Sequence, residues 1–402
     1  MDASGRKRLQ DLRERATVFR ERFLADLIQL AQMRTPSGQE AARVRFLRDR
    51  MTQSGVPNVG QDEAGNAVGV IPGTEPTRTV MLVAHLDSAL TTETDVNVTI
   101  KDDRAVGAGI SGTPLASSML CLLPEVLDAL HIRLKSNLVL LGSVASRGSA
   151  TANGLNRHLE HTELKPDIGL VLEGLPLGKV NCFSIGSMRG NITVNTEARP
   201  QFGYGAESAL VVVTRIVNRM LEIAVPRRPY TEIRLGRLRA GYSHDIEPDE
   251  ASLGFEVVSY DENIMQAVLE RIRDATAEMA SRYQANVDLD IFHSRSAGGL
   301  SFTHPLVKRA RSVLEALEVE PVQNHTAGEL THFISRSIPA LSLGLSHGKR
   351  NLQSSDYVLI EPLFTGIAQI VGLLQEIDEG ACDADASFAT SATAIPNVPL
   401  ES

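Results

Sequence analysis

The chain has 402 residues, more than a single hydrophobic core usually organises, so we expect two domains. Its hydrophobic content of 43% and charged content of 22% are typical of a soluble globular protein, and its net charge of −9 leaves no basic footprint for nucleic acid. Three widely spaced cysteines argue against a disulfide framework or a cysteine zinc site, and no apolar run is long enough to span a membrane. The highly charged first 22 residues do not resemble a signal peptide, so we expect a cytoplasmic protein without membrane or nucleic-acid partners.

Strands alternate with helices along most of the chain. Residues 9–54 predict two amphipathic helices, separated at the turn Thr35-Pro36-Ser37-Gly38. Helices are also predicted at Leu115–Ala129 and Leu306–Leu317. Apolar runs predict five strands: Ala67–Ile71, Thr79–Ala84, Asn137–Gly142, Ile168–Glu173 and Ala340–Leu345. This alternation predicts an α/β fold in which helices cover both faces of a mixed sheet.

Residues 189–293 predict a different order of elements, the β-α-β-β-α-β order of a ferredoxin-like unit. The predicted elements are Asn191–Thr196, Ala206–Ile223, Glu232–Leu238, Ser252–Val258, Glu262–Tyr283 and Val287–Phe292. We therefore expect an inserted domain at 189–293, a main domain made of 1–188 and 294–379, and a disordered Ala/Ser-rich tail at 380–402.

A candidate site begins where the strand Thr79–Ala84 ends, at His85-Leu86-Asp87. Residues i and i+2 of an extended segment share one face, so His85 and Asp87 can project together. An imidazole that binds a metal is commonly oriented by a carboxylate. His-x-Asp alone is also an ordinary surface pair, so the motif needs support from elsewhere in the chain.

That support comes from five segments in order: HLDS (85–88), GAGISGTPLA (107–116), GSVASRG (142–148), VLEG (171–174) and AGYSHDIEPDEA (240–251). Their order, spacing and predicted context resemble the zinc metallopeptidase family of aminoacylase, carnosinase-type dipeptidases, glutamate carboxypeptidase and succinyl-diaminopimelate desuccinylase. The resemblance covers roughly residues 9–378. It implies a catalytic α/β domain with an inserted lid that forms homodimers, and a substrate that is a peptide or an acylated amino acid.

The family's chemistry uses two zinc ions, a bridging carboxylate and a glutamate that activates water. Matched position by position, His85 and Glu173 keep two ligands of one metal, and Asp87 keeps the orienting role. The other positions have lost their chemistry: Gly112 replaces the bridging aspartate, Ser146 the general base, Arg147 a glutamate ligand and Leu352 the last histidine.

A shifted alignment does not restore the missing carboxylates. No Asp or Glu lies between Asp103 and Glu125, or between Asp128 and Glu160. We therefore expect no resident zinc. We also expect the Arg147 guanidinium to neutralise carboxylates that a metal would otherwise compensate.

The substrate side of the site is altered as well. In the lid, Pro200 stands where the resemblance implies a histidine, and Asp245 stands where it implies an asparagine that faces the substrate. Asp245 would repel a substrate carboxylate. Arg350 is a candidate for receiving an anion, with a solvated basic loop as the alternative. His347 is a candidate third metal ligand and also a candidate for binding the substrate. The predicted substrate-binding residues are Asp245, Pro200, Arg350 and His347.

Two further patterns are weaker. Residues 344–348 match the G-x-S-x-G elbow of serine hydrolases, but no histidine follows His347 and the next residues predict a loop. His325, Glu329 and His332 could share one helix face as a metal site, unless the helix begins only after Gly328.

Three functional hypotheses follow. The leading one is a catalytically silent homologue that binds a peptide or acylated amino acid, or that serves as a regulatory or assembly partner. The second is a hydrolase with one weakly held zinc on His85, Glu173 and His347. The third is a metal-free enzyme that uses His85 as acid–base catalyst with Asp87 orienting it.

Overall fold

Two parts of the chain fold around separate hydrophobic cores. This computed structural model describes residues 2–88, 90, 94–146, 153–197, 207–323, 328–350, 356–383 and 388–389. Within them, Met1–Phe183 with Gly299–Phe388 forms unit 1, and Ser184–Gly298 forms unit 2. Four candidates from the sequence lie outside the described residues: Arg147, Pro200, His325 and Leu352.

A seven-stranded mixed sheet in the order β1-β2-β6-β3-β7-β15-β8 forms the centre of unit 1. The four neighbours β6, β3, β7 and β15 are parallel; β2 and β8 run antiparallel to them, and β1 runs antiparallel to β2. All five predicted strands are confirmed. The strands are β1 (Asn58–Gln61), β2 (Ala67–Ile71), β6 (Asn137–Ser143), β3 (Thr79–His85), β7 (Ile168–Leu172), β15 (Ala340–Leu343) and β8 (Val180–Asn181).

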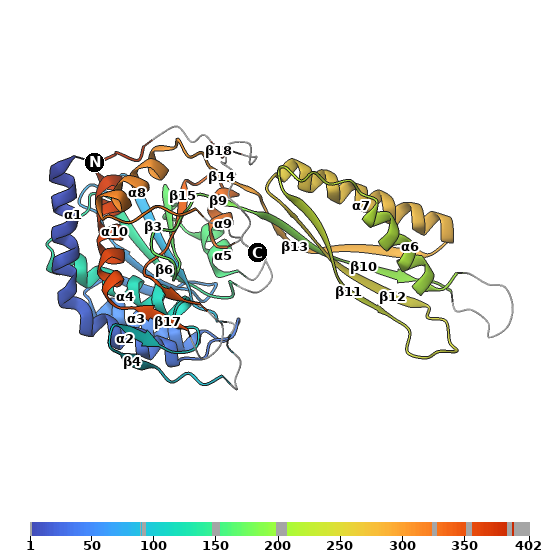
Figure 1. Cartoon of the computed structure of the whole chain (residues 1–402), viewed down its shortest axis with the longest axis horizontal. Helices are drawn as coiled ribbons and strands as arrows, with labels where there is room; N and C mark the ends of the chain where they lie inside the picture. The colour runs from blue at the N-terminus through green and yellow to red at the C-terminus, as the bar shows by residue number, and fades with distance from the viewer. Residues whose placement is uncertain are drawn as a thin grey trace. The chain divides into compact units, whose positions relative to one another are not determined.

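Helices pack on both faces of this sheet (Figure 1). Successive residues of β3 point to opposite sides, so Leu82 joins one core cluster and Met81 the other. This arrangement explains why β3 is apolar throughout, since a strand covered on both faces has no solvent side. One face carries α1 (Ala3–Ala16), α2 (Arg20–Gln32), α3 (Ala41–Gln53), α4 (Thr113–Ala129), α8 (Pro305–Ala316) and α10 (Glu361–Asp378), and the other carries α5 (Gly154–His161) and α9 (Leu330–Ile334).

Unit 1 departs from the sequence prediction in three places. Residues 9–54 contain more than two helices, because a 3-10 turn at Thr17–Phe19 separates α1 from α2 before the expected break. A small antiparallel sheet was not predicted; it contains β4 (Thr99–Lys101), β5 (Arg104–Val106), β16 (Gly348–Lys349) and β17 (Tyr357–Leu359). The prediction of disorder from residue 380 is wrong at its start, since Cys382 is buried and Asp383 pairs with Arg78 at 2.6 Å. Beyond Asp383 only Phe388–Ala389 (β18) is described.

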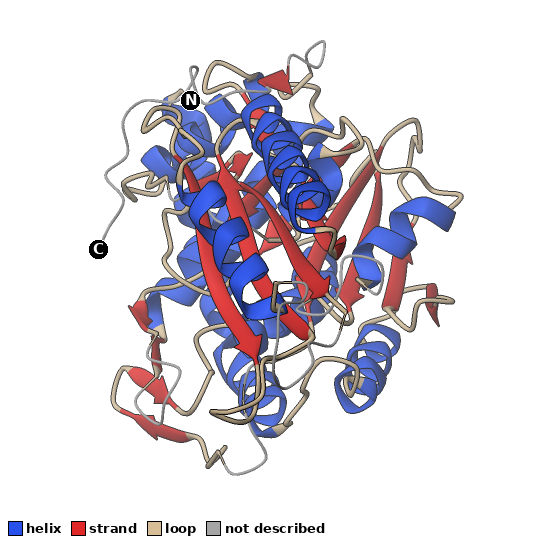
Figure 2. Cartoon of the chain, turned by 90° about the vertical axis from the view of Figure 1, so that its right-hand side faces the viewer, coloured by secondary structure: helices blue, strands red, loops and turns tan. Residues whose placement is uncertain are grey.

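Unit 2 is an antiparallel sheet in the order β11-β12-β10-β13, with α6 and α7 packed on it (Figure 2). The element order is the predicted β-α-β-β-α-β. Asp261 caps α7 by accepting a hydrogen bond from the Ile264 backbone N–H at 3.1 Å. The elements are β10 (Gly186–Asn195), α6 (Ala209–Leu221), β11 (Thr231–Ala240), β12 (Glu250–Ser259), α7 (Glu262–Tyr283) and β13 (Asn286–Arg295).

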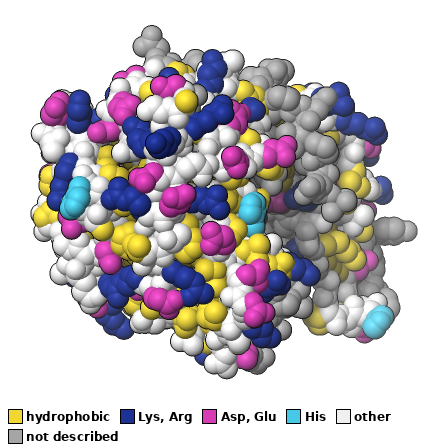
Figure 3. All heavy atoms as spheres, turned by 60° about the vertical axis from the view of Figure 1, so that its left-hand side comes forward, with side chains coloured by type: hydrophobic (Ala, Val, Ile, Leu, Met, Phe, Trp, Pro, Cys, Tyr) yellow, Lys and Arg dark blue, Asp and Glu magenta, His cyan; other side chains and the backbone are white. Residues whose placement is uncertain are grey.

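The surface carries charges of both signs (Figure 3), and the three cysteines lie in the interior. Basic and acidic side chains are interspersed over the face shown in Figure 3. Cys121, Cys182 and Cys382 are buried and form no disulfide. Among the described helices, none is both long and apolar enough to cross a membrane.

Candidate functional site

The candidate site lies at the carboxyl ends of the central parallel strands. His85 is the last residue of β3 and pairs with Ser143 of β6. Glu173 follows β7, and its backbone N–H donates to the Leu343 carbonyl of β15 at 2.8 Å. Because parallel strands end at one edge of a sheet, His85, Glu173 and the loop after β6 are gathered there. Ligand sites of open α/β sheets occur at this edge.

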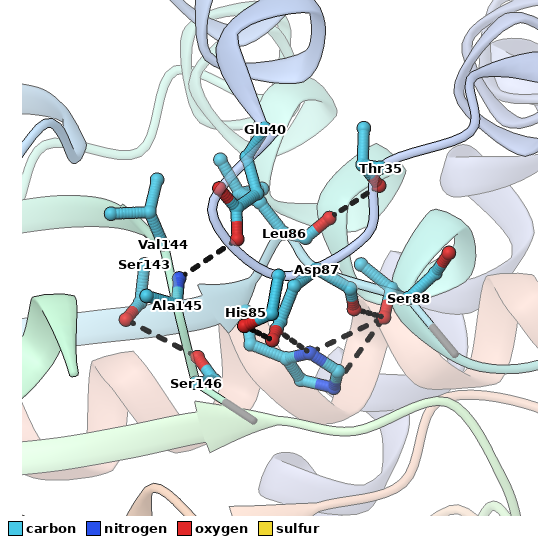
Figure 4. Close-up of polar contacts among 12 residues, drawn as sticks. Thr35, Glu40, His85, Leu86, Asp87, Ser88, Ser143, Val144, Ala145 and Ser146 are labelled. Atoms are coloured by element: carbon cyan, nitrogen blue, oxygen red, sulfur yellow. Dashed lines mark hydrogen bonds and ion pairs between the residues drawn. The ribbon is translucent and has the colours of Figure 1, made fainter. Parts of the chain in front are cut away.

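The His85 imidazole is oriented by a buried carboxylate (Figure 4). Nδ1 of His85 lies 3.2 Å from Oδ1 of Asp87, and the Ser37 hydroxyl donates to Oδ2 of Asp87 at 2.9 Å. The Thr113 hydroxyl donates to the Asp87 carbonyl at 3.0 Å and lies 3.3 Å from His85 Nδ1. The Asp87 side chain is fully buried, whereas that of His85 is 22% exposed. The pair therefore presents a fixed imidazole outward from the strand end.

A buried arginine lies close enough to Asp87 for their charges to interact. The Arg43 guanidinium donates to the backbone carbonyls of Leu86 at 2.7 Å and of Leu30 and Met33 at 2.9 Å. Burial lowers the pKa of Arg43 to about 10, and the charge of Asp87 acts in the opposite direction. Arg43 is thus a cation at neutral pH and compensates Asp87. Arg43 was not among the candidate residues predicted from the sequence.

Glu40 ties the start of α3 to the loop that carries Ser146. One carboxylate oxygen of Glu40 accepts the backbone N–H groups of Gly38 and Ala145, each at 2.9 Å (Figure 4). Ala145 has a φ of 54°, a left-handed conformation that an alanine adopts only when its surroundings hold it there. Ser146, with its Oγ 3.5 Å from that of Ser143, follows this turn. A serine hydroxyl does not titrate near neutral pH, so Ser146 cannot act as the general base.

Glu173 forms an ion pair with a buried lysine. The Lys179 ammonium donates to Oε2 of Glu173, and the Lys179 side chain is only 6% exposed. Lys179 lies in the loop between β7 and β8, after the cis Leu175-Pro176 bond. From the sequence, the compensating charge was expected on Arg147, which is outside the described residues. For Glu173, the structure gives that role to Lys179.

Gly112 lies beside the Arg350 guanidinium. A Cβ added to Gly112 would lie 3.5 Å from Nη2 of Arg350 and 3.9 Å from its Cζ. A Cβ on Gly174 would lie 1.7 Å from the Ser111 carbonyl oxygen and 3.0 Å from the Gly112 Cα, so the backbone after Glu173 packs directly onto Gly112. The position that the resemblance assigns to a bridging carboxylate therefore faces a cation.

The serine-hydrolase pattern is structural. Ser346 is fully buried and its hydroxyl donates to the Leu359 carbonyl at 2.7 Å. The chain then continues into β16 instead of a helix. A nucleophile elbow needs an exposed serine on a strand-to-helix turn, so this alternative fails.

The remaining candidates do not assemble into a metal site. Among the described residues, no three His, Cys, Asp or Glu side chains lie close enough to hold a metal ion, so His85, Glu173 and His347 are not such a group. Helix α9 begins at Leu330, after Gly328, and Glu329 lies 4.0 Å from His332. Asp245 is exposed in unit 2, where it accepts a hydrogen bond from Ser243.

Solved structures share this fold, although no family model and no curated protein matches the sequence. A tripeptidase from Staphylococcus aureus is 17% identical with a TM-score of 0.76, over 90% of this chain and 99% of that one. A dinuclear metal-binding peptidase of the M20 family from Bacillus subtilis is 15% identical with a TM-score of 0.70, over 90% and 99%. Human carnosine dipeptidase 1 is 10% identical with a TM-score of 0.64, over 92% and 100%. The chain therefore has the M20 peptidase fold, which the motif resemblance predicted.

Proposed function

We propose that this chain is a binding protein with the fold of the dinuclear zinc peptidases and N-acyl-amino-acid amidohydrolases, in which the metal site has been dismantled. The strand-end site would hold a peptide or an acylated amino acid without cleaving it. The observation that carries the proposal is the ion pair between Glu173 and the buried Lys179. A carboxylate that is neutralised inside the protein has little charge left to offer a metal ion.

The donor set does not fit two zinc ions. Catalytic zinc ordinarily takes three protein ligands and a water. Here the retained ligands are His85 and Glu173, and the Lys179 ammonium would repel a dication. Gly112 has no side chain with which to bridge two metals. Ser146 cannot take and return the proton of an attacking water.

We extend the proposal to unit 2 as a ferredoxin-like lid that also mediates a homodimer. Its sheet ends at two outer strands, β11 and β13, and such edges are available for pairing with a second chain. A cytoplasmic location agrees with three buried cysteines that are not in disulfides.

Zinc stoichiometry is the decisive test. Purified chain would be incubated with excess zinc, desalted and analysed by plasma mass spectrometry, with His85→Ala as the matched variant. We expect both proteins to carry far less than one zinc per chain. Near-stoichiometric zinc in the wild type that disappears in His85→Ala would overturn the proposal.

A second candidate is a metal-free enzyme, favoured by the partly exposed His85 imidazole on its buried Asp87. Assays with dipeptides and N-acyl amino acids separate the two. Turnover that survives a chelator and is lost in His85→Ala supports the enzyme. Thermal stabilisation by the ligand without turnover supports the binding protein.

A further inference from the structure

We infer that the strand-end site binds an anionic group of its ligand on Arg350, beside Gly112, in place of a metal-polarised carbonyl. We call Gly112, Glu173, Arg350 and His85 the Arg350 site. The inference rests on the proposed absence of resident zinc. It adds the chemical class of the ligand, which must carry a carboxylate or another oxyanion.

Three contacts bring the Arg350 site together. The Arg350 guanidinium faces the open side of Gly112, where a Cβ would lie 3.5 Å from Nη2. The backbone just after Glu173 packs on the Gly112 Cα. Thr113, the next residue after Gly112, has its hydroxyl 3.3 Å from His85 Nδ1. Gly112 thus connects the guanidinium to both retained family residues.

Arg350 has no carboxylate partner of its own in the described part of the chain, whereas two carboxylates around the site have cations. Asp87 is compensated by the buried Arg43, and Glu173 by Lys179. Two more carboxylates lie nearby and are held by hydrogen bonds: Glu40 accepts two backbone N–H groups, and the buried Asp356 accepts the Ser111 hydroxyl at 3.0 Å. Arg350 is exposed and forms no ion pair with any residue of the described chain. A cation without an internal partner at a strand-end site is available to an anion.

The guanidinium also defines the chemistry of recognition. Its planar N–H fork matches the two oxygens of a carboxylate or a phosphate and forms paired, charge-assisted hydrogen bonds. A neutral amide offers only one such oxygen and no charge. The ligand should therefore approach Arg350 with its acidic end. For a peptide or an acylated amino acid, this end is the carboxylate.

The first test compares three probes on chelator-treated, full-length protein at constant ionic strength: N-acetylglycine, N-acetylglycinamide and inorganic phosphate. Isothermal titration calorimetry should show the acid binding at least about tenfold more tightly than the amide. Tighter binding of the acid than of phosphate identifies a carboxylate ligand, and the reverse order identifies a phosphate. Equal binding of acid and amide, or binding of no probe, overturns the inference.

Variants locate the anion. Arg350→Ala should weaken N-acetylglycine binding by about tenfold or more, whereas Lys101→Ala, which removes an exposed cation from the far strand β4 of the same small sheet, should change it by less than about twofold. Equal losses in the two variants would indicate nonspecific attraction and overturn the assignment to Arg350.

The variant Gly112→Asp places a carboxylate inside the protein that would compete with the ligand for the Arg350 guanidinium. Its Cβ fits at ordinary contact distance from Arg350, so the new carboxylate should pair with the guanidinium and abolish anion binding. Gly112→Asn, of the same size but neutral, should keep most of the binding, and thermal unfolding checks that both variants fold. Equal binding by Asp and Asn variants contradicts the inference. Because these measurements use metal-free protein, their failure is distinct from that of the zinc test.

Discussion

Two histidine–aspartate pairs lie in the described part of unit 1, and they differ in which partner is buried. In the pair His85–Asp87 the carboxylate is 0% exposed and the imidazole 22%. In the pair His158–Asp62 the imidazole is 8% exposed and the carboxylate 21%. A buried carboxylate that holds an open imidazole is suited to meeting a ligand. A buried imidazole that holds an open carboxylate joins two parts of the fold.

The contacts of the second pair show this structural role. Asp62 accepts hydrogen bonds from His158 Nδ1 at 2.8 Å, from the Asn66 side chain at 2.7 Å and from the Asn66 backbone at 2.9 Å. These bonds fasten the turn between β1 and β2 to α5. A cavity of about 860 Å³ lies beside the pair. However, Nε2 of His158 is buried and has no hydrogen-bond partner among the described residues, so the cavity does not present a free ring nitrogen of His158 to a ligand.

The largest expected effect is on the stability of the second pair. Asp62→Ala leaves three donors without their acceptor and should lower the free energy of unfolding by about 3 kcal/mol. His85→Ala removes a partly exposed ring and should cost less than about 1 kcal/mol. Urea unfolding of both variants measures this difference. Equal losses would break the distinction between a structural and an open pair.

The variant Lys179→Met tests the ion pair between Lys179 and Glu173, which lies at the same strand ends as His85. Removing one partner of a fully buried pair costs about 3–5 kcal/mol, and the partial exposure of Glu173 should reduce this to about 2 kcal/mol. The double variant with Glu173→Gln should recover most of the loss, because no uncompensated carboxylate is left. A double variant as unstable as the single one would show that Lys179 matters through packing instead of charge.

A histidine in unit 2 shows an effect of burial that the nearby Glu256 carboxylate opposes but does not outweigh. Burial lowers the pKa of His293 to about 4, and the nearby Arg295 and Arg189 act in the same direction. Since the unfolded chain binds this proton near pH 6.5, stability should be lost as pH falls from about 6.5 to 4, by on the order of 1 kcal/mol. His293→Gln should flatten this limb of the denaturation profile. An unchanged slope would contradict the assignment.

The smallest expected effect is the acid response of Asp62. Burial acts to raise its pKa, but hydrogen bonds from His158 and Asn66 outweigh burial and hold the pKa below 3.8. The group therefore adds stability above pH 3.8 that is lost as pH falls through the lower folded value. Asp62→Asn should respond less steeply to acid below that pH in urea unfolding, and a wild-type slope in this variant would argue against an ionised Asp62.

The fold was predictable because its strands and helices repeat strong patterns. Thr79–Ala84 could be recognised as a buried strand from its apolar run alone. The strands of the small sheet, such as Gly348–Lys349, are two or three residues long and carry too little periodicity to be recognised. Thr17–Phe19 was missed because a 3-10 turn changes the helical phase without a Pro or Gly signal.

Candidate site residues could be named from the sequence only where a motif is kept. His85 and Asp87 were named from a motif at a strand end and Glu173 from the family resemblance, whereas Lys179 was not named because a loop has no period that relates it to Glu173. Arg43 did leave a signal. It falls on the same helix stripe as Leu47 and Met51, and a charge on an apolar stripe indicates a buried partner.

The Lys179–Glu173 pair has a consequence for reading related sequences. A lysine this deeply covered needs an acidic neighbour whether or not a metal is present. Natural selection can thus retain Glu173 purely as a counter-ion. A survey that scores surviving ligand positions would count it as a metal ligand and overstate the case for zinc. Positions without such an internal partner, as at Gly112, are the more informative ones to compare.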